Sequence, residues 1–120
     1  MLIDSNIIIY SAQPHHGELR SFIAEHAPAV SAVSVVEVLG YQKLSEGDRA
    51  KLEAFFDAAT VLPLDDEVVW EAVRLRQLRR MTLGDALVAA TTLVAGRTLV
   101  TRNVRDFDWI PGLNVLNLLD

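Results

Sequence analysis

The stretch that decides the fold is TLGDALVAATTLVAGRTLVT, residues 82–101. Thr82 to Asp85 carries the polar and small residues that open a helix, and Ala86 to Ala95 is apolar almost all round apart from two threonines. Gly96 ends this helix, and Thr98 to Thr101 follows as a short strand candidate. Because a helix without a polar face must be covered on most sides, the stretch predicts a buried core helix followed by a strand.

The same alternation of strand and helix continues through the rest of the chain. Other short strands are predicted at residues 1–3, 28–33, 60–64 and 114–118, with helices between them. The helix after Asp65 has a single apolar stripe, formed by Val68, Val69, Ala72, Val73, Leu75 and Leu78. Short strands without polar alternation, separated by helices, are typical of a parallel sheet. We therefore predict a three-layer α/β/α fold with a short central parallel sheet and helices on both faces.

Length and composition indicate one globular domain, residues 1–120. Hydrophobic residues make up 51% and charged residues 22% of the chain, which excludes a disordered protein. The longest apolar runs are far shorter than the roughly 20 residues that cross a bilayer, and the first residues lack the basic start of a signal peptide. The absence of cysteine excludes disulfides and thiolate metal sites. We expect a cytoplasmic protein that makes no use of a membrane.

The charges are unevenly distributed along the chain. The formal net charge of −5 is unusual for a nucleic-acid-binding protein. Between residues 74 and 105, however, seven arginines accompany a single acid, Asp85. Guanidinium groups suit phosphate well, although a solvated helix face is the more common reason for such a run. On charge alone the segment therefore indicates an ordinary solvated surface more often than a surface that binds a polyanion.

Four carboxylates stand where an apolar strand stops or the buried helix starts. Asp4, Glu37 and Asp106 follow three of the strand candidates, and Asp85 opens the core helix. If the strands are parallel, several of these acids lie at one edge of the sheet, where their charges raise one another's pKa unless a cation is present. With oxygen ligands, no cysteine, and the three histidines confined to one early segment, Mg²⁺ or Mn²⁺ is favoured over zinc.

Each acid also has an ordinary structural explanation. Asp4 is a good helix cap, and Glu37 and Asp85 are spaced to complete capping boxes with Ser34 and Thr82. The fourth acid lies in a polar loop, where aspartates commonly stabilise turns. Caps and turns do not require that four acids gather with arginines and threonines at strand ends, so we prefer the hypothesis of a metal site.

Four motifs follow one another along the chain: IDSN at 3–6, SAVSVVEVLG at 31–40, TLGDALVAAT at 82–91 and LVTRNVRDF at 99–107. In this order they resemble those of the PIN-domain ribonucleases, in particular the VapC-type toxins of bacterial and archaeal toxin–antitoxin pairs. The resemblance implies a PIN-like fold in which Asp4, Glu37 and Asp85 hold a catalytic metal ion. Many PIN domains place an aspartate directly after the Thr-Arg pair, where this chain has Asn103, so we expect Asp106 to act as the fourth acid.

The resemblance also implies an activity. A bound Mg²⁺ or Mn²⁺ ion would activate a water molecule that hydrolyses an RNA phosphodiester, leaving a 5′-phosphate and a 3′-hydroxyl. The candidates for holding water or phosphate beside the metal are Ser5, Asn6, Thr101 and Asn103. The candidates for binding the RNA backbone are Arg79, Arg80, Arg102 and Arg105.

Two kinds of protein partner are expected. The resemblance implies a VapB-type antitoxin whose C-terminal segment lies across the active groove. Apolar residues available for such a contact are Leu19, Phe22, Ile23, Leu39, Tyr41 and Leu44. We also expect a homodimer, because a domain of this size has limited volume in which to bury so much apolar helix surface.

Two other hypotheses compete with a ribonuclease. One is a catalytically degenerate PIN-fold module that binds RNA or protein, which the retention of the acids disfavours. The other is a phosphoryl-transfer enzyme with Asp4 as nucleophile. Phosphatases of that kind carry a second aspartate where this chain has Asn6, and receiver domains carry a lysine where Thr101 and Arg102 stand.

Overall fold

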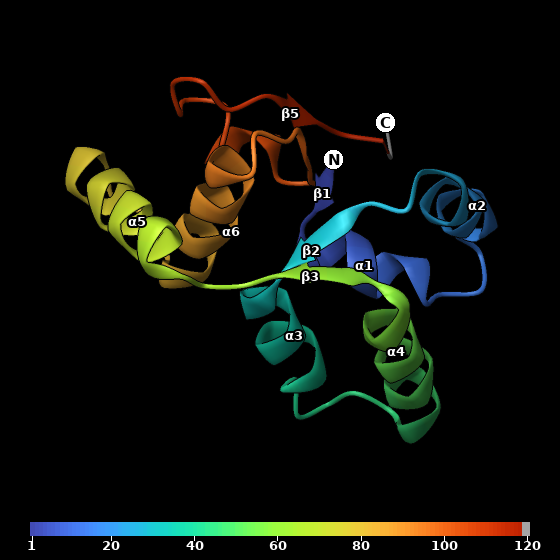
Figure 1. The fold of residues 1–120 in the computed structure, drawn as a ribbon. Helices are drawn as coiled ribbons and strands as arrows, with labels where there is room; N and C mark the ends of the chain where they lie inside the picture. Colours follow the sequence, from blue (N-terminus) through green and yellow to red (C-terminus); the bar gives the residue numbers. More distant parts are fainter. Residues whose placement is uncertain (119–120) are drawn as a thin grey trace.

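A five-stranded parallel sheet lies between two layers of helices in the computed structural model, which describes residues 1–118 (Figure 1). The strands are β1 (Leu2–Ile3), β2 (Ala29–Ser31), β3 (Thr60–Leu62), β4 (Leu99–Val100) and β5 (Val115–Leu116). The helices are α1 (Ser5–Ser11), α2 (Gly17–His26), α3 (Ala32–Leu39), α4 (Glu46–Ala58), α5 (Asp66–Leu78) and α6 (Leu83–Val94), with a 3₁₀ helix η1 (Val104–Asp106). The strand order is β3-β2-β1-β4-β5, and every pairing is parallel. The predicted α/β/α fold is confirmed.

Two hydrophobic cores lie on opposite faces of the sheet. Leu2 and Leu99 pack with α5 and α6, whereas Ile3 and Val100 pack with α1, α2, α3 and α4. All four side chains are completely buried. The alternation follows from the pleat, since successive strand residues point to opposite faces. With both faces covered by apolar packing, the polar and charged groups of this region are confined to the ends of the strands.

Helix α6 is the buried core helix that the sequence predicts. Its buried residues are Ala86, Val88, Ala89, Ala90, Thr91 and Thr92. The hydroxyls of Thr91 and Thr92 donate to the carbonyls of Leu87 and Val88 at 2.6 and 2.8 Å, so their burial leaves no donor unsatisfied. The Thr91 hydroxyl is also hydrogen-bonded to Ser31 Oγ at 3.1 Å, which joins α6 to the end of β2.

The start of α3 differs from the prediction. Ala32 and Val33 belong to the helix and not to the strand, because Ser31 is the N-cap and its Oγ accepts from the backbone N–H of Val33 at 3.2 Å. The capping box predicted for Ser34 and Glu37 is therefore wrong, and Glu37 lies well inside the helix. The β-branched residues of this segment suggested a longer strand, but the serine cap decides where the helix begins.

Half of the apolar stripe predicted for α5 is exposed. Val68, Ala72 and Leu75 are buried against α6 and the sheet, whereas Val69 and Val73 are exposed, together with the neighbouring Trp70. A helix that packs against one neighbour buries only a narrow face, so the flanking apolar positions remain in solvent. None of the helices within residues 1–118 has both the length and the apolar character needed to cross a bilayer.

Candidate active site

The centre of the site lies where the strand order reverses. β2 and β4 pair with opposite edges of β1, and such a reversal is where parallel sheets bind ligands. Asp4 directly follows β1 and Thr101 directly follows β4. The Thr101 hydroxyl donates to Asp4 Oδ2 at 2.8 Å, and both side chains are buried. A polar pair therefore occupies the carboxyl edge at the middle of the sheet.

Asp4 is both a helix cap and a member of this polar cluster. Its Oδ1 accepts from the backbone N–H of Ser5 at 2.8 Å, which starts α1. Asn6 Nδ2 lies 3.4 Å from Asp4 Oδ2 and 3.4 Å from Thr101 Oγ1. Asn6 Oδ1 accepts from the backbone N–H of Arg102 at 3.3 Å. These bonds join the chain after β1 to the chain after β4 and hold the Asp4 carboxylate in one orientation.

Glu37 reaches the same edge from α3. Its Oε1 accepts from the Ser5 hydroxyl at 2.8 Å, and Ser5 Oγ is also hydrogen-bonded to Ser34 Oγ at 2.8 Å. On its other side the Glu37 carboxylate lies against Gly84, where an added Cβ would come within 2.5 Å of Oε2. Because Gly84 precedes Asp85 in the first turn of α6, the contact brings Glu37 beside the segment that carries the third acid.

Asp85 and Asp106 complete the acidic group. Thr82 caps α6, as predicted, with its Oγ1 accepting from the backbone N–H of Asp85 at 3.1 Å. Partial burial raises the pKa of the Asp85 carboxyl, and the charges of Asp106 and Glu37 raise it further, whereas a hydrogen bond with Thr82 lowers it. The exposed Asp106, from η1, is therefore near enough to Asp85 for the two carboxylates to repel each other.

Neighbouring acids also affect the pKa of Asp4. Burial raises it from 3.8 to about 6, against hydrogen bonds from Thr101 and Ser5 that lower it, and the charges of Asp85 and Glu37 add to the rise. The charges of Asp85 and Glu37 thus act on Asp4, and those of Asp106 and Glu37 act on Asp85, at one edge of the sheet. Among residues 1–118, no cationic side chain forms an ion pair with any of these four acids, so their repulsion is not compensated in this way.

The chemistry of this group suits a hard divalent cation. Carboxylate, hydroxyl and amide oxygens are its ligand types, and the chain has no cysteine. Within residues 1–118, no three carboxylate or imidazole groups are already arranged as a complete ligand set. Asp4 and Glu37 are instead engaged by Thr101 and Ser5. The oxygens that suit a cation therefore lie at the carboxyl edge of the sheet. Their present orientation is determined by hydrogen bonds to neighbouring side chains.

The predicted RNA-binding arginines divide into two pairs. Arg102 and Arg105 line, with Asn103 and Asp106, a hollow of about 360 Å³ next to the acidic group. The backbone N–H of Asn103 donates to Thr101 Oγ1 at 3.1 Å, so this loop is anchored to the polar pair at the centre of the site.

Arg79 and Arg80 lie at the end of α5 and line a different hollow, which contains none of the four acids. The Arg79 guanidinium lies 5.2 Å from the centre of the Trp109 ring, a cation–π contact. The structure therefore does not bring these two arginines into the same hollow as Arg102 and Arg105.

Sequence reasoning missed two residues that shape the site. Ser34 was interpreted only as a cap, but it contacts Ser5 beside Glu37. Gly84 was not singled out, although a glycine in the first turn of an otherwise strongly helical segment is a signal of close approach by another group.

Most of the chain matches a known domain family. The model of the PIN domain matches residues 1–113, which contain all four motifs and all four acids. The chain belongs to the PIN-domain family. Ribonuclease VapC1 of Rickettsia felis is 35% identical to this PIN domain over 100 residues, which are 74% of this chain and 75% of the relative. Ribonuclease VapC19 of Mycobacterium tuberculosis is 29% identical over 119 residues, 93% and 95% of the two chains.

Solved structures of similar fold are toxin–antitoxin complexes. A complex from Klebsiella pneumoniae has a TM-score of 0.76 to this PIN domain at 26% identity, and covers 96% of this chain and 94% of that chain. The DNA-bound VapBC of Salmonella typhimurium has a TM-score of 0.83 at 20% identity, with 97% and 96% coverage. The predicted resemblance to PIN domains of the VapC type is confirmed.

The raised pKa of Asp4 predicts how stability depends on pH in the absence of divalent cations. Because the folded state holds this proton up to about pH 6 and the unfolded state only to about pH 4, stability is lost as the pH rises through this window, by about 3 kcal/mol in total. Asp4→Asn removes the titration and keeps a capping side chain. In EDTA, the variant should gain stability relative to the unsubstituted protein between pH 4 and pH 7 in urea unfolding.

The Thr101→Val variant provides the opposite change. Loss of the hydroxyl that lowers the pKa of Asp4 should enlarge the loss of stability between pH 4 and pH 7. Equal pH dependence of the unsubstituted protein and Asp4→Asn would show that burial of this carboxylate does not affect folding.

Proposed function

We propose that this chain is an endoribonuclease dependent on Mg²⁺ or Mn²⁺ and the toxin of a toxin–antitoxin pair. The observation that carries the proposal is that the charges of Glu37 and Asp85 act on Asp4, and that of Asp106 on Asp85, at the edge where the strand order reverses, near Arg102. Relatives named Ribonuclease VapC support a nuclease, and structural neighbours that are toxin–antitoxin complexes support the pairing. Since cellular RNA is the proposed substrate, we propose the cytoplasm as the compartment.

The four acids would hold the metal ion. When bound, the ion lowers the pKa of a water molecule and neutralises the charge that builds on the phosphoryl oxygens. The neutral Asn103, in the position where many PIN domains have an acid, leaves less negative charge near Asp106. We therefore propose that one ion is held more tightly than any second one.

The neighbouring side chains orient the acids. Thr101 and Asn6 hold the Asp4 carboxylate from one side, and Ser5 holds that of Glu37. Such pre-orientation reduces the reorganisation that ligand binding would otherwise require. Arg102 and Arg105, in the adjoining hollow, would bind phosphates of the RNA backbone and supply affinity without reading the base sequence.

The substitution Asp85→Asn tests the proposal. It keeps the size of a side chain in the first turn of α6 and removes a charged oxygen ligand. Cleavage of RNA in Mn²⁺ should fall at least a hundredfold, measured by gel electrophoresis of an end-labelled RNA. The matched control is Asp66→Asn, in the first turn of α5, which should cleave at the unsubstituted rate.

The outcome separates the ribonuclease from its alternative. Undiminished cleavage by Asp85→Asn would reject the acidic group as the catalytic centre. If the unsubstituted protein binds many RNAs with and without Mn²⁺ and cleaves none, the chain is a degenerate PIN-fold module instead.

The contact between Gly84 and Glu37 gives a second prediction. In Gly84→Ala the new methyl group displaces the end of the flexible Glu37 side chain, while alanine favours the helix by about 0.5–1 kcal/mol. RNA cleavage should therefore fall at least tenfold while the melting temperature stays equal or rises. Gly47→Ala, in α4, is the control because nothing lies near its added Cβ. A fully active Gly84→Ala variant would show that the position of Glu37 is unimportant.

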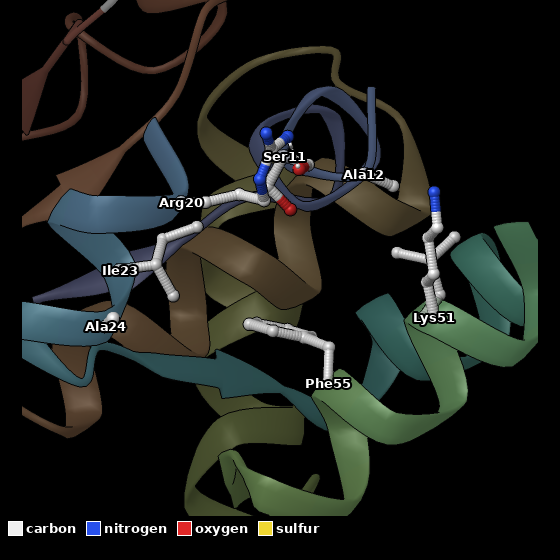
Figure 2. Close-up of a pocket in the computed structure, with 8 residues that line it drawn as sticks. Ser11, Ala12, Arg20, Ile23, Ala24, Lys51 and Phe55 are labelled. Atoms are coloured by element: carbon white, nitrogen blue, oxygen red, sulfur yellow. Dashed lines mark hydrogen bonds between the residues drawn. The ribbon is translucent and has the colours of Figure 1, made fainter. Parts of the chain in front are cut away.

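A groove between α1, α2 and α4 is the proposed antitoxin site. Figure 2 shows Ile23 of α2 and Phe55 of α4 directed toward each other across it, with Arg20 and Lys51 near its rim. The groove has a volume of about 440 Å³. Its apolar floor and cationic rim suit an antitoxin segment that combines an apolar anchor with acidic side chains. Of the apolar residues that the sequence offered for this contact, Ile23 lines the groove and Leu19 is buried in the core.

The substitution Ile23→Asp tests this groove. A carboxylate on its apolar wall should abolish co-purification with a small protein encoded beside this chain and leave RNA cleavage unchanged. Val94→Asp, at a partly exposed apolar position on α6, is the control and should retain the partner. Retention of the partner by Ile23→Asp would exclude this groove as its docking site.

We also propose a homodimer that uses α5. Val69, Trp70 and Val73 lie on one side of this helix and are exposed, with Trp70 exposed to 69%. A large exposed aromatic side chain flanked by valines is typical of the centre of an interface. A monomer in sedimentation at micromolar concentration, without the partner, would contradict this proposal.

A further inference from the structure

A second hollow shares Arg102 with the hollow that Asp106 lines, and none of the four acids is among its described lining residues. It has a volume of about 680 Å³, within the range of ligand pockets, and lies between the loop joining α1 to α2, α2 itself and the segment after β4. Its walls include His15 and His16 from the loop, Phe22 from α2, Arg102 from the segment after β4, and Leu118. We name it the histidine hollow.

The loop that carries the two histidines is held in place by an arginine. The Arg20 guanidinium donates to the backbone carbonyls of Ser11 at 3.1 Å, Gln13 at 2.5 Å and Pro14 at 3.2 Å. These bonds fix the turn directly before His15. The histidines therefore stand on a pre-organised support, which lowers the entropy that a ligand must overcome.

Flat side chains follow one another along the wall of the hollow. The rings of His15 and His16 are 4.2 Å apart between centroids, and His16 meets the edge of Tyr10 at 5.5 Å. The Arg102 guanidinium lies 4.8 Å from the centre of the Tyr10 ring. Tyr10 thus contacts both His16 and Arg102, and two imidazole rings and a guanidinium group line the hollow.

The charge of the hollow suits an anion. Within residues 1–118 the ion pair between side chains is the one that joins Arg74 to Glu71, so Arg102 keeps its charge free for a ligand. Glu18 is the acid among the described residues that line the hollow. Partial burial, with the nearby positive charges of His15, Arg102 and Arg20, holds the pKa of His16 below its ordinary value. This shift favours the neutral imidazole, so the cationic group that the hollow offers an anion is Arg102.

Arg102 connects the histidine hollow to the acidic group. It lines this hollow and also the neighbouring one that contains Arg105 and Asp106. Its backbone N–H donates to Asn6, which in turn contacts Asp4. A polyanion that extends from the histidine hollow into the hollow of Arg105 and Asp106 would therefore contact the Arg102 guanidinium.

We propose that the histidine hollow binds one nucleotide of single-stranded RNA next to the phosphate that is cleaved. The base stacks on the imidazoles of His15 and His16, and the adjoining phosphate is bound by Arg102. Stacking on aromatic faces needs an unpaired base, because the faces of a base in a duplex are already covered. The inference rests on the proposed ribonuclease function and adds to it a stacking subsite for one base.

Two double variants test this subsite. The first, His15→Ala with His16→Ala, removes both rings; the second, His15→Phe with His16→Phe, keeps flat rings without the imidazole nitrogens. His26→Ala, a histidine of α2 that does not line the hollow, is the control. Binding of a fluorescent 12-nucleotide single-stranded RNA is measured by anisotropy in EDTA, so that metal-dependent cleavage does not interfere. A duplex of the same sequence is measured in parallel.

The subsite predicts a specific pattern of affinities. The alanine double variant should bind the single strand about tenfold more weakly, the phenylalanine double variant within threefold of the unsubstituted chain, and His26→Ala equally well. Affinity for the duplex should not change. In Mn²⁺, the alanine double variant should raise KM and leave kcat within twofold, because the rings bind substrate and do not take part in the reaction.

Several results would overturn the subsite. Unchanged affinity of the alanine double variant, or equal weakening by alanine and phenylalanine, would exclude stacking on these rings. If the alanine variant instead loses binding of a polyglutamate peptide and keeps that of RNA, the hollow is a site for an acidic peptide. If the unsubstituted protein cleaves RNA and the alanine variant binds RNA with unchanged affinity, only the subsite is rejected. If the variants bind RNA with the predicted affinities but the unsubstituted protein does not cleave it, only the proposed function is rejected.

Discussion

A carboxylate buried at the middle of a parallel sheet is the constraint on which the site depends. Asp4 ends β1 between two apolar cores, and burial raises its pKa to about 6 in spite of the hydrogen bonds from Thr101 and Ser5. A charge in such a position needs compensation from its surroundings. The charges of two further acids, Asp85 and Glu37, raise the pKa of Asp4 as well. The divalent cation that we propose for this site would supply that compensation.

Some residues of the candidate site are also the residues that cap the helices. Asp4 caps α1, Thr82 caps α6 and Ser31 caps α3, and these caps determine where each helix begins at the carboxyl edge of the sheet. Since helix starts and strand ends coincide there, an acid in a cap or first turn is automatically directed toward the site. The structural and functional explanations of Asp4 and Asp85 are therefore compatible, because one position satisfies both.

The charge distribution also becomes interpretable in three dimensions. A net charge of −5 argues against nucleic-acid binding when averaged over the chain, but part of the acidity is concentrated in the cluster at the sheet edge. Arg102 lies beside that cluster, supported by Tyr10, whereas Arg79 packs on Trp109 at the end of α5. Arginines that look equivalent in the sequence therefore have different surroundings in the structure.

The sequence by itself determined the layers of the fold and the types of residue at the site. Apolar helix periodicity, capping residues and short strands are local signals, so the core helix α6 and the alternation of strands and helices were predicted correctly. The start of α3, the exposed side of α5, and the contacts of Glu37 with Ser5 and Gly84 were decided only by tertiary structure. These features depend on which elements are neighbours across the sheet. The local sequence of one element does not indicate which distant elements it will contact.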